Sequence, residues 1–259
     1  GELSEGARRL TDADRQRADK LFEKALSVPT VEEEEATWTD LIEGFRGVPE
    51  VEARAFANRG NSRARQGKFE QALADYGRSI EIAPGEVDGY LNRGGVLEAL
   101  GRFEDALVDY AVVLSIDPRD PAGWNNRGNA LLALRRFEES RDCFKAALRY
   151  SGGPQKFSFA AVNLALAEFE LGNDEVAFKD LQSLLRLYAD AFPDARAFYA
   201  LALWERGDRV RAEEEWDRAT AVDARYKSKT WIRESRRWPP RLQSVLLRFA
   251  ETTSVKVKE

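Results

Sequence analysis

The chain has 259 residues, of which 43% are hydrophobic, and this is enough to form a buried core. No stretch approaches the roughly 18 consecutive apolar residues of a membrane-spanning helix. The sequence contains no His and a single Cys, Cys143. This composition excludes a Ser-His-Asp triad, a Cys-His dyad, a His-ligated metal, a four-Cys zinc site and an intrachain disulfide. We therefore expect no enzymatic activity and no cofactor or metal.

The charge argues against a nucleic-acid partner. Forty Lys and Arg residues against 45 Asp and Glu residues give a net charge of −5, whereas a general nucleic-acid binder must neutralise many phosphates. The charge is also uneven along the chain. Residues 1–52 contain seven basic and fourteen acidic residues, while residues 225–259 contain ten basic and three acidic residues. The two ends therefore have opposite character.

The first 52 residues form an acidic N-terminal segment. Apolar residues at helical spacing predict two amphipathic helices over 12–27 and 31–46. The acidic run Glu32–Glu35 is expected in a solvated first turn, where the helix dipole favours negative charge. The segment lacks the regularly spaced small residues found further along the chain, so it is a degenerate helix pair.

Residues 53–154 repeat with a period of 34 residues. The tripeptide Asn-Arg-Gly recurs at 58–60, 92–94 and 126–128. The same interval relates three sets of aromatic residues: Phe56, Tyr90 and Trp124; Phe69, Phe103 and Phe137; Tyr76, Tyr110 and Phe144. The spacing predicts three equal units over 53–86, 87–120 and 121–154, each made of two helices.

Glycine and proline mark the ends of these helices. Gly67 and Gly101 lie where a left-handed residue would end the first helix, and Pro84 closes the second helix of the first unit. In the third unit Arg135 replaces the turn glycine, so we expect a strained turn there. The glycines of Asn-Arg-Gly lie inside the first helix, where each costs about 1 kcal/mol relative to Ala. We expect close helix packing at Gly60, Gly94 and Gly128.

This pattern resembles the tetratricopeptide repeat (TPR) family. The resemblance rests on an aromatic, a small and a large residue on the first helix, followed by a small residue, an aromatic and a closing Pro on the second. Two weaker units follow over 158–191 and 193–226. The resemblance covers about 12–226 and implies an all-α fold, a right-handed solenoid of five helical hairpins over 53–226.

The repeat stops at residue 226. Residues 226–238 and 241–251 are predicted to form two helices broken at Pro239-Pro240, followed by a polar tail. A stack of helix pairs has an exposed apolar end, so we expect residues 227–259 to cap it. The predicted capping residues are Trp231, Trp238, Leu242, Leu246 and Phe249.

The resemblance implies a concave groove, lined by the first helices, that holds a partner peptide or helix. Four asparagines occupy equivalent places in successive units, and three more lie beside them. An amide can both donate to and accept from an extended backbone. Alternatively, these asparagines bridge neighbouring helices as part of the fold. The predicted groove residues are Asn58, Asn61, Asn92, Asn125, Asn126, Asn129 and Asn163.

The arginines of Asn-Arg-Gly have a structural interpretation. Arg59, Arg93 and Arg127 recur at one place in the unit, while Asp75 and Asp109 recur at another. An Arg fork also matches a phosphate or carboxylate ligand. Regularly spaced opposite charges nevertheless favour ion pairs between helices, which is our prediction.

The residues required for one known function of the family are not all present. Its chaperone-binding members grip a C-terminal carboxylate with three cations and two asparagines. The corresponding residues here are Ala57, Asn61, Asn92, Ala122 and Asn126. Both asparagines are present and all three cations are missing, so we do not expect capture of chaperone tails by this dicarboxylate clamp.

The basic C-terminal region carries more cations than a cap requires. We predict an electrostatic patch of Arg233, Arg236, Arg237 and Arg241 that contacts an acidic protein surface or the anionic lipids of a membrane. Pairing with the acidic N-terminal segment of this chain is an alternative.

The sequence therefore predicts a non-enzymatic scaffold for a protein partner. The Asn-Arg-Gly motifs, with Asp-Tyr at 75–76 and 109–110, and the stretch 236–242 also resemble TPR proteins of cyanobacteria and plastids. That resemblance implies an assembly or maintenance factor for photosynthetic membrane complexes, located in the chloroplast at the thylakoid. The chain contains no Met and starts at Gly1, so we expect that an upstream segment with any targeting peptide was removed. The alternative is a cytosolic co-chaperone or regulatory adaptor without the dicarboxylate clamp.

Overall fold

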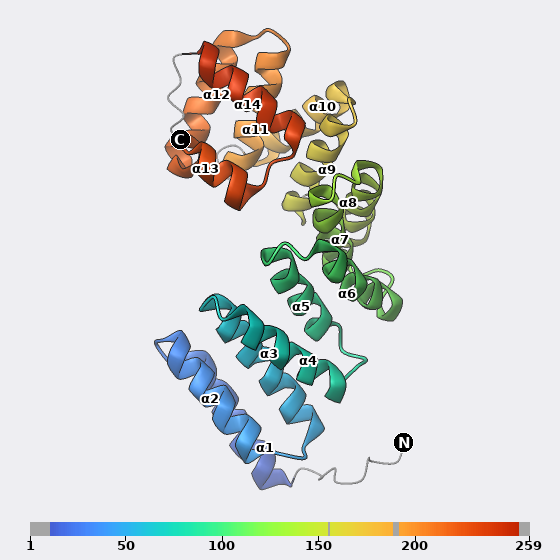
Figure 1. The fold of residues 1–259 in the computed structure, drawn as a ribbon, viewed down its shortest axis with the longest axis vertical. Coiled ribbons are helices and arrows are strands. Elements are labelled where there is room, and N and C mark those ends of the chain that lie inside the picture. Colours follow the sequence, from blue (N-terminus) through green and yellow to red (C-terminus); the bar gives the residue numbers. More distant parts are fainter. Residues whose placement is uncertain (1–10, 155, 189–191, 254–259) are drawn as a thin grey trace. The chain divides into compact units, whose positions relative to one another are not determined.

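A computed structural model describes residues 11–154, 156–188 and 192–253. These residues form helices and turns without a β-strand, which confirms the predicted all-α fold (Figure 1). The chain divides into two compact halves, Gly1–Pro118 and Arg119–Glu259. The boundary between them falls inside the array predicted over 53–226, and each half is described by itself. None of the described helices is long and apolar enough to cross a lipid bilayer.

The N-terminal half consists of consecutive helix pairs. The Thr11 hydroxyl caps the first helix by accepting from the Asp14 backbone N–H, and the Asp14 carboxylate accepts from the Thr11 backbone N–H. Thr30 caps the second helix. Pro49 occupies the first position of the third helix, where its missing N–H is harmless. The helices are α1 (Asp12–Ser27), α2 (Val31–Gly44), α3 (Pro49–Arg65), α4 (Phe69–Ile82), α5 (Val87–Ala99) and α6 (Phe103–Ile116).

The C-terminal half continues the pairs and ends in two further helices. They are α7 (Pro121–Ala133), α8 (Phe137–Ser151), α9 (Ser158–Glu170), α10 (Asp174–Tyr188), α11 (Pro193–Glu205), α12 (Arg209–Val222), α13 (Lys229–Trp231) and α14 (Pro240–Thr252). The stretch predicted as helical over 226–238 is divided into short pieces. A 3₁₀ turn, the short α13 and a π-helical turn occupy this segment, and Arg237 ends it with a φ of +53°.

The helix glycines are explained by aromatic rings of the paired helix. A Cβ atom added to Gly94 would lie 2.5 Å from the ring of Tyr110, and one on Gly60 would lie 2.7 Å from Tyr76. Phe144 approaches Gly128 in the same way, at 2.6 Å. Such distances leave no room for a methyl group. The close packing predicted from the Asn-Arg-Gly repeat is confirmed.

The turns between paired helices use a left-handed residue. Gly67 and Gly101 have φ values of +73° and +76°. Arg135 adopts φ of +61° at the equivalent turn, although it carries a Cβ. Because this conformation strains residues other than Gly, the predicted strain in the third turn is confirmed.

A partly buried ionic network joins α2 to α3 and the turn that follows it. Glu35 accepts from Arg63 Nε at 2.8 Å, from Gln66 Nε2 at 2.8 Å and from Lys68 Nζ at 2.9 Å. Burial opposes ionisation of this carboxyl, but the hydrogen bonds from Lys68, Arg63 and Gln66 outweigh it and lower the Glu35 pKa to about 2. The acidic run therefore does not lie entirely in solvent as predicted, because Glu35 is held by α3 and its turn.

The C-terminal helix α14 covers the apolar end of the array. It packs on α9 and α11, the first helices of the fourth and fifth repeats (Figure 1). Its apolar face is fully buried, and the Phe249 ring lies 5.2 Å from Trp216 and 6.3 Å from Trp204. Trp238 is also buried, and Trp231 packs edge-on against Tyr226 at 5.1 Å. Four of the five predicted capping residues are thus buried here, and Trp231 is partly buried.

We predict that Arg135→Gly stabilises the chain by about 1 kcal/mol, because Gly removes the strain of a left-handed residue that bears a Cβ. Urea denaturation of both proteins measures the change. The reverse exchange at the equivalent turn, Gly101→Ala, should lower stability by a similar amount. Destabilisation by Arg135→Gly would contradict the strained-turn interpretation.

The Glu35 network should make stability depend on pH. The pKa of Glu35 is lowered in the folded chain from 4.5 to about 2, so its stabilising effect is complete above pH 4.5 and is lost as pH falls toward 2. We expect Glu35→Gln to lower the free energy of unfolding above pH 4.5, with the difference shrinking toward pH 2. Thermal unfolding across this range tests it, with Glu43→Gln on the exposed side of α2 as the control. A constant difference would refute the linkage.

Truncating a capping aromatic should strongly destabilise the C-terminal half. We expect Phe249→Ala to lower the free energy of unfolding by about 3–5 kcal/mol, as for other fully buried aromatics. Leu247→Ala is the matched control, because Leu247 lies on the same helix and is 48% exposed. Equal melting temperatures for the two variants would mean that α14 is not packed.

Candidate functional site

The N-terminal half contains a groove of about 580 Å³ on the side of its first helices α3 and α5. We call it the amide groove, because the predicted asparagines of this half all line it. Asn58 and Asn61 come from α3, and Asn92 comes from α5. The volume lies within the range typical of ligand-binding clefts.

Apolar residues of the neighbouring helices complete the amide groove. Leu26 of α1, Trp38 of α2 and Ile82 of α4 line it, and Leu26 is 74% exposed. The sequence pattern did not identify these residues as part of a binding groove. Leu26 and Trp38 belong to the degenerate first pair, where no repeat signal marks equivalent positions, so only the folded structure places them beside the asparagines.

A tyrosine orients one groove amide. Tyr76 donates its hydroxyl to Asn61 Oδ1 at 2.8 Å. Burial raises the pKa of Tyr76 to about 12, so the hydroxyl stays protonated and keeps donating at neutral pH. Because the oxygen of the Asn61 amide is thus engaged, its Nδ2 group is left to donate to a ligand.

The other two asparagines offer different atoms. Asn58 Nδ2 donates to the Arg54 carbonyl oxygen at 3.0 Å within α3, which leaves Asn58 Oδ1 as an acceptor. Asn92 makes no side-chain hydrogen bond with any residue that the structure describes. The amide groove therefore presents both donors and acceptors, as an extended backbone requires.

Charged residues lie at the rim of the amide groove. Glu50, Glu86 and Asp88 line it and are exposed. The lining also includes Arg54, whose guanidinium lies 4.2 Å from the centre of the Phe22 ring. The carboxylates thus outnumber the cation at this surface.

The ion pairs predicted for the repeat arginines are confirmed in the first two units. Arg59 donates to both oxygens of Asp75 at 3.0 and 2.8 Å, and Arg93 does the same to Asp109 at 2.8 and 2.6 Å. Hydrogen bonding to Asp109 raises the pKa of Arg93 above its ordinary value. These arginines hold paired helices together, so their forks are not available to a phosphate or carboxylate ligand.

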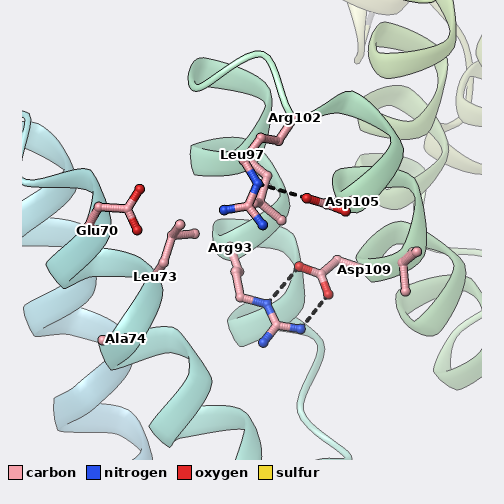
Figure 2. Close-up of a pocket in the computed structure, with 9 residues that line it drawn as sticks. Glu70, Leu73, Ala74, Arg93, Leu97, Arg102, Asp105 and Asp109 are labelled. Atoms are coloured by element: carbon pink, nitrogen blue, oxygen red, sulfur yellow. Dashed lines mark hydrogen bonds and ion pairs between the residues drawn. The ribbon is translucent and has the colours of Figure 1, made fainter.

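A second pocket, of about 560 Å³, lies between α4 and the pair α5–α6. Figure 2 shows Glu70 and Leu73 of α4 facing Arg93 and Arg102 across it. Arg102 donates to Asp105 at 2.8 Å, so both arginines of the pocket are already paired with carboxylates. The pocket therefore lacks an open cation for an anionic ligand. Among the described residues, no group of His, Cys, Asp or Glu could hold a metal ion.

The third repeat departs from the ion-pair pattern. Cys143 stands at the place of Asp75 and Asp109, so this place offers Arg127 no carboxylate. Arg127 keeps the ring contact of the repeat, 5.7 Å from the centre of Trp124, as Arg59 does with Phe56 and Arg93 with Tyr90. Burial raises the Cys143 pKa to about 11, so this side chain remains a neutral thiol.

In the C-terminal half the predicted groove asparagines bind other residues of the chain. Asn163 Nδ2 donates to Asn129 Oδ1 at 2.9 Å, and Asn163 Oδ1 accepts from Arg236 at 3.2 Å. Asn125 is buried and donates to Asn126 Oδ1 at 3.2 Å. This corrects the prediction that Asn163 contacts a partner, because both its Nδ2 and its Oδ1 are bonded within the chain. The alternative interpretation, bridging between helices, describes the pair Asn129 and Asn163.

The helix α14 fills the first-helix side of the fourth and fifth repeats. The Glu170 carboxylate of α9 accepts from the backbone N–H groups of Arg241 at 3.2 Å and Leu242 at 3.0 Å, and so caps the N-terminus of α14. Arg241 also pairs with Asp174 at 2.7 Å and stacks 3.9 Å from the centre of the Phe169 ring. These bonds join α14 to α9 and α10, so α14 itself covers this side of the two repeats.

Asp194 anchors the segment before α14. It accepts from Arg236 Nε and the Tyr226 hydroxyl, both at 2.7 Å, and from Trp238 Nε1 at 3.2 Å. Burial opposes ionisation of Asp194, but the adjacent Arg236 guanidinium keeps its pKa below the ordinary value. Arg236 and Asp194 therefore form a buried ion pair within the chain.

These contacts correct the prediction of an electrostatic patch for two of its four arginines. Arg236 and Arg241 do not face solvent as open cations, because each is paired with a carboxylate and packed against other residues. Arg233 and Arg237 are exposed, and Arg233 pairs with its neighbour Glu234 at 3.0 Å. Arg236 and Arg241 therefore help to attach the cap to the repeats.

Comparison with known proteins supports the repeat. Family models described as "Tetratricopeptide repeat" match residues 53–86 and 121–153. These ranges coincide with the first predicted unit and with nearly all of the third. No curated protein matches the sequence.

Solved structures share the fold at low sequence identity. A tetratricopeptide repeat protein from Parabacteroides merdae is 18% identical, with 93% of this chain and 95% of that chain covered and a TM-score of 0.66. The pilF protein of Pseudomonas aeruginosa is 21% identical over 78% and 90%, with a TM-score of 0.61. YrrB, described as a TPR protein with an unusual peptide-binding site, is 16% identical over 72% and 92%, with a TM-score of 0.55.

The period of 34 residues, the glycine–aromatic packing and the consecutive helix pairs agree with these matches. The chain therefore contains tetratricopeptide repeats, and its fold is that of a tetratricopeptide-repeat helical solenoid.

Proposed function

We propose that the chain is a protein-interaction scaffold that holds an extended peptide segment of a partner in the amide groove. One observation carries this proposal. Asn58, Asn61 and Asn92 line a groove with hydrogen-bonding atoms left open, whereas the equivalent Asn163 is bound by Arg236.

The chemistry of the groove suits a peptide backbone. Each residue of an extended segment presents one N–H donor and one C=O acceptor. Asn61 offers donors, because Tyr76 engages its oxygen, while Asn58 offers an acceptor. Leu26 and Ile82 add apolar surface that a ligand side chain can cover. Hydrogen bonds would thus set the register of the peptide, and apolar contact would supply affinity.

A solved relative of the fold supports the same use. YrrB is described as a TPR protein with an unusual peptide-binding site. Its likeness to this chain is one of fold, so the role of individual residues rests on the geometry of the amide groove alone.

Binding fits the groove better than either rival function. The lining residues include no Cys, and the chain contains no His, so the groove offers neither a thiol nucleophile nor an imidazole base. A co-chaperone with a dicarboxylate clamp would need a cation where Ala57 lines the groove. A cytosolic adaptor without that clamp remains the alternative to the setting proposed next.

We propose a chloroplast setting, with a thylakoid-associated partner in a photosynthetic membrane complex, on the sequence resemblance alone. Import of the full-length precursor into isolated chloroplasts tests it. A precursor that is neither imported nor processed would leave the cytosolic adaptor as the better hypothesis.

The asparagines can be tested with peptides selected from a random library displayed on phage, using the full chain as bait. We expect Asn58→Ala combined with Asn92→Ala to weaken binding of the selected peptides by about tenfold, because two hydrogen-bonding groups are lost at roughly 1 kcal/mol or less each. Fluorescence anisotropy measures Kd, and circular dichroism checks the fold.

Asn163→Ala is the matched control for this double variant. It removes an equivalent amide that Asn129 and Arg236 already occupy, so peptide affinity should not change. Unaltered binding by the Asn58 and Asn92 double variant would refute the amide groove as the peptide site.

A further inference from the structure

We infer that the amide groove selects a peptide segment that carries a Lys or Arg side chain. This inference rests on the proposed function and adds the chemistry of the ligand. It is carried by the charge of the groove, the size of its floor residues and the state of its one lining guanidinium.

Three lining carboxylates are open to a ligand. Glu50 lies in the first turn of α3, Glu86 immediately precedes α5, and Asp88 lies in the first turn of α5. Within the part of the chain that the structure describes, no hydrogen bond or ion pair engages these carboxylates. A cation entering the groove would therefore meet carboxylates without displacing an existing partner.

The lining cation does not neutralise this surface. The Arg54 guanidinium stacks on Phe22, with 4.2 Å between the guanidinium carbon and the ring centre. This arrangement directs the charge of Arg54 toward α1 and leaves it without a carboxylate partner in the groove. A concave surface of one predominant sign attracts ligands of the opposite sign.

Helix capping does not account for all of these acids. A carboxylate in the first turn favours the helix dipole. In α3, however, Glu52 already serves the first turn, because its carboxylate accepts from the Gly47 backbone N–H at 3.0 Å. Glu50 is a second acid in the same turn and lines the groove instead. Glu50 can therefore serve a ligand as well as the helix dipole.

The floor of the groove fits the stem of a long basic side chain. Ala53 and Ala57 present small methyl groups there, and Leu26 is an exposed apolar residue beside them. Lys and Arg can lay an aliphatic stem along such a surface while the charged head reaches a carboxylate. An anionic ligand would instead face three carboxylates against the single cation Arg54.

The test uses peptides selected on the full chain from the random library, then resynthesised with amidated C-termini. We expect Lys or Arg at one shared position, and replacement of that residue by Gln should weaken binding about tenfold. The combined variant Glu50→Gln, Glu86→Gln and Asp88→Asn should lose about as much affinity. Its remaining binding should depend less on salt, because exposed charge pairs are screened as ionic strength rises.

A matched control removes the same number of charges elsewhere in the N-terminal half. Glu23→Gln, Glu43→Gln and Glu70→Gln alter exposed residues that do not line the amide groove. This triple variant should bind the selected peptides as the original chain does. An equal loss in both triple variants would mean that general charge, not the groove, attracts the peptide, and would overturn the inference.

The outcomes separate this inference from the proposed function. If binding depends on Asn58 and Asn92 but is unaffected by the groove carboxylate variant, the ligand chemistry is wrong while the groove stands. If the selected peptides share no basic residue, the inference is also overturned. If no peptide binds in a way that depends on the asparagines, the proposed function fails, and the inference fails with it.

Discussion

The packing of α14 on α9 and α11 determines which repeat surfaces remain open in the C-terminal half. Phe249 and Leu242 are fully buried against these helices, and Glu170 caps α14 through its first backbone N–H groups. Several buried apolar side chains at roughly 1.5–3 kcal/mol each make this a permanent attachment rather than a transient one. The half therefore uses its own helix where a partner helix could otherwise lie. In the N-terminal half, Asn58, Asn61 and Asn92 line a groove.

The repeat itself was predictable, because its physical cause is local. Gly94 must lack a Cβ since Tyr110 packs at that point, and the same need recurs every 34 residues along the chain. The strained turn at Arg135 was also predictable, because a left-handed position tolerates Gly best. The two helices of the degenerate first pair were also predictable, because their apolar residues keep a helical spacing where the regularly spaced small residues of the repeat are missing.

Contacts between distant residues could not be obtained in this way. The sequence identifies Arg236 and Arg241 as basic, but their carboxylate partners Asp194 and Asp174 lie 42 and 67 residues away. An excess of arginines consequently resembled a binding patch. The asparagines show the same limit, because equivalent positions in the repeat have different neighbours. Tyr76 leaves the Asn61 N–H groups open, whereas the chain's own C-terminal segment occupies Asn163.

The proposed function requires that a ligand binds on α3 and α5 while α14 stays in place. Hydrogen exchange of the full chain, with and without a saturating selected peptide, tests this most directly. We expect slower exchange of backbone N–H groups in α3 and α5 on binding, with unchanged exchange in α9, α11 and α14. Slower exchange in α9 and α11 together with faster exchange in α14 would contradict it, because the peptide would then have replaced the C-terminal helix.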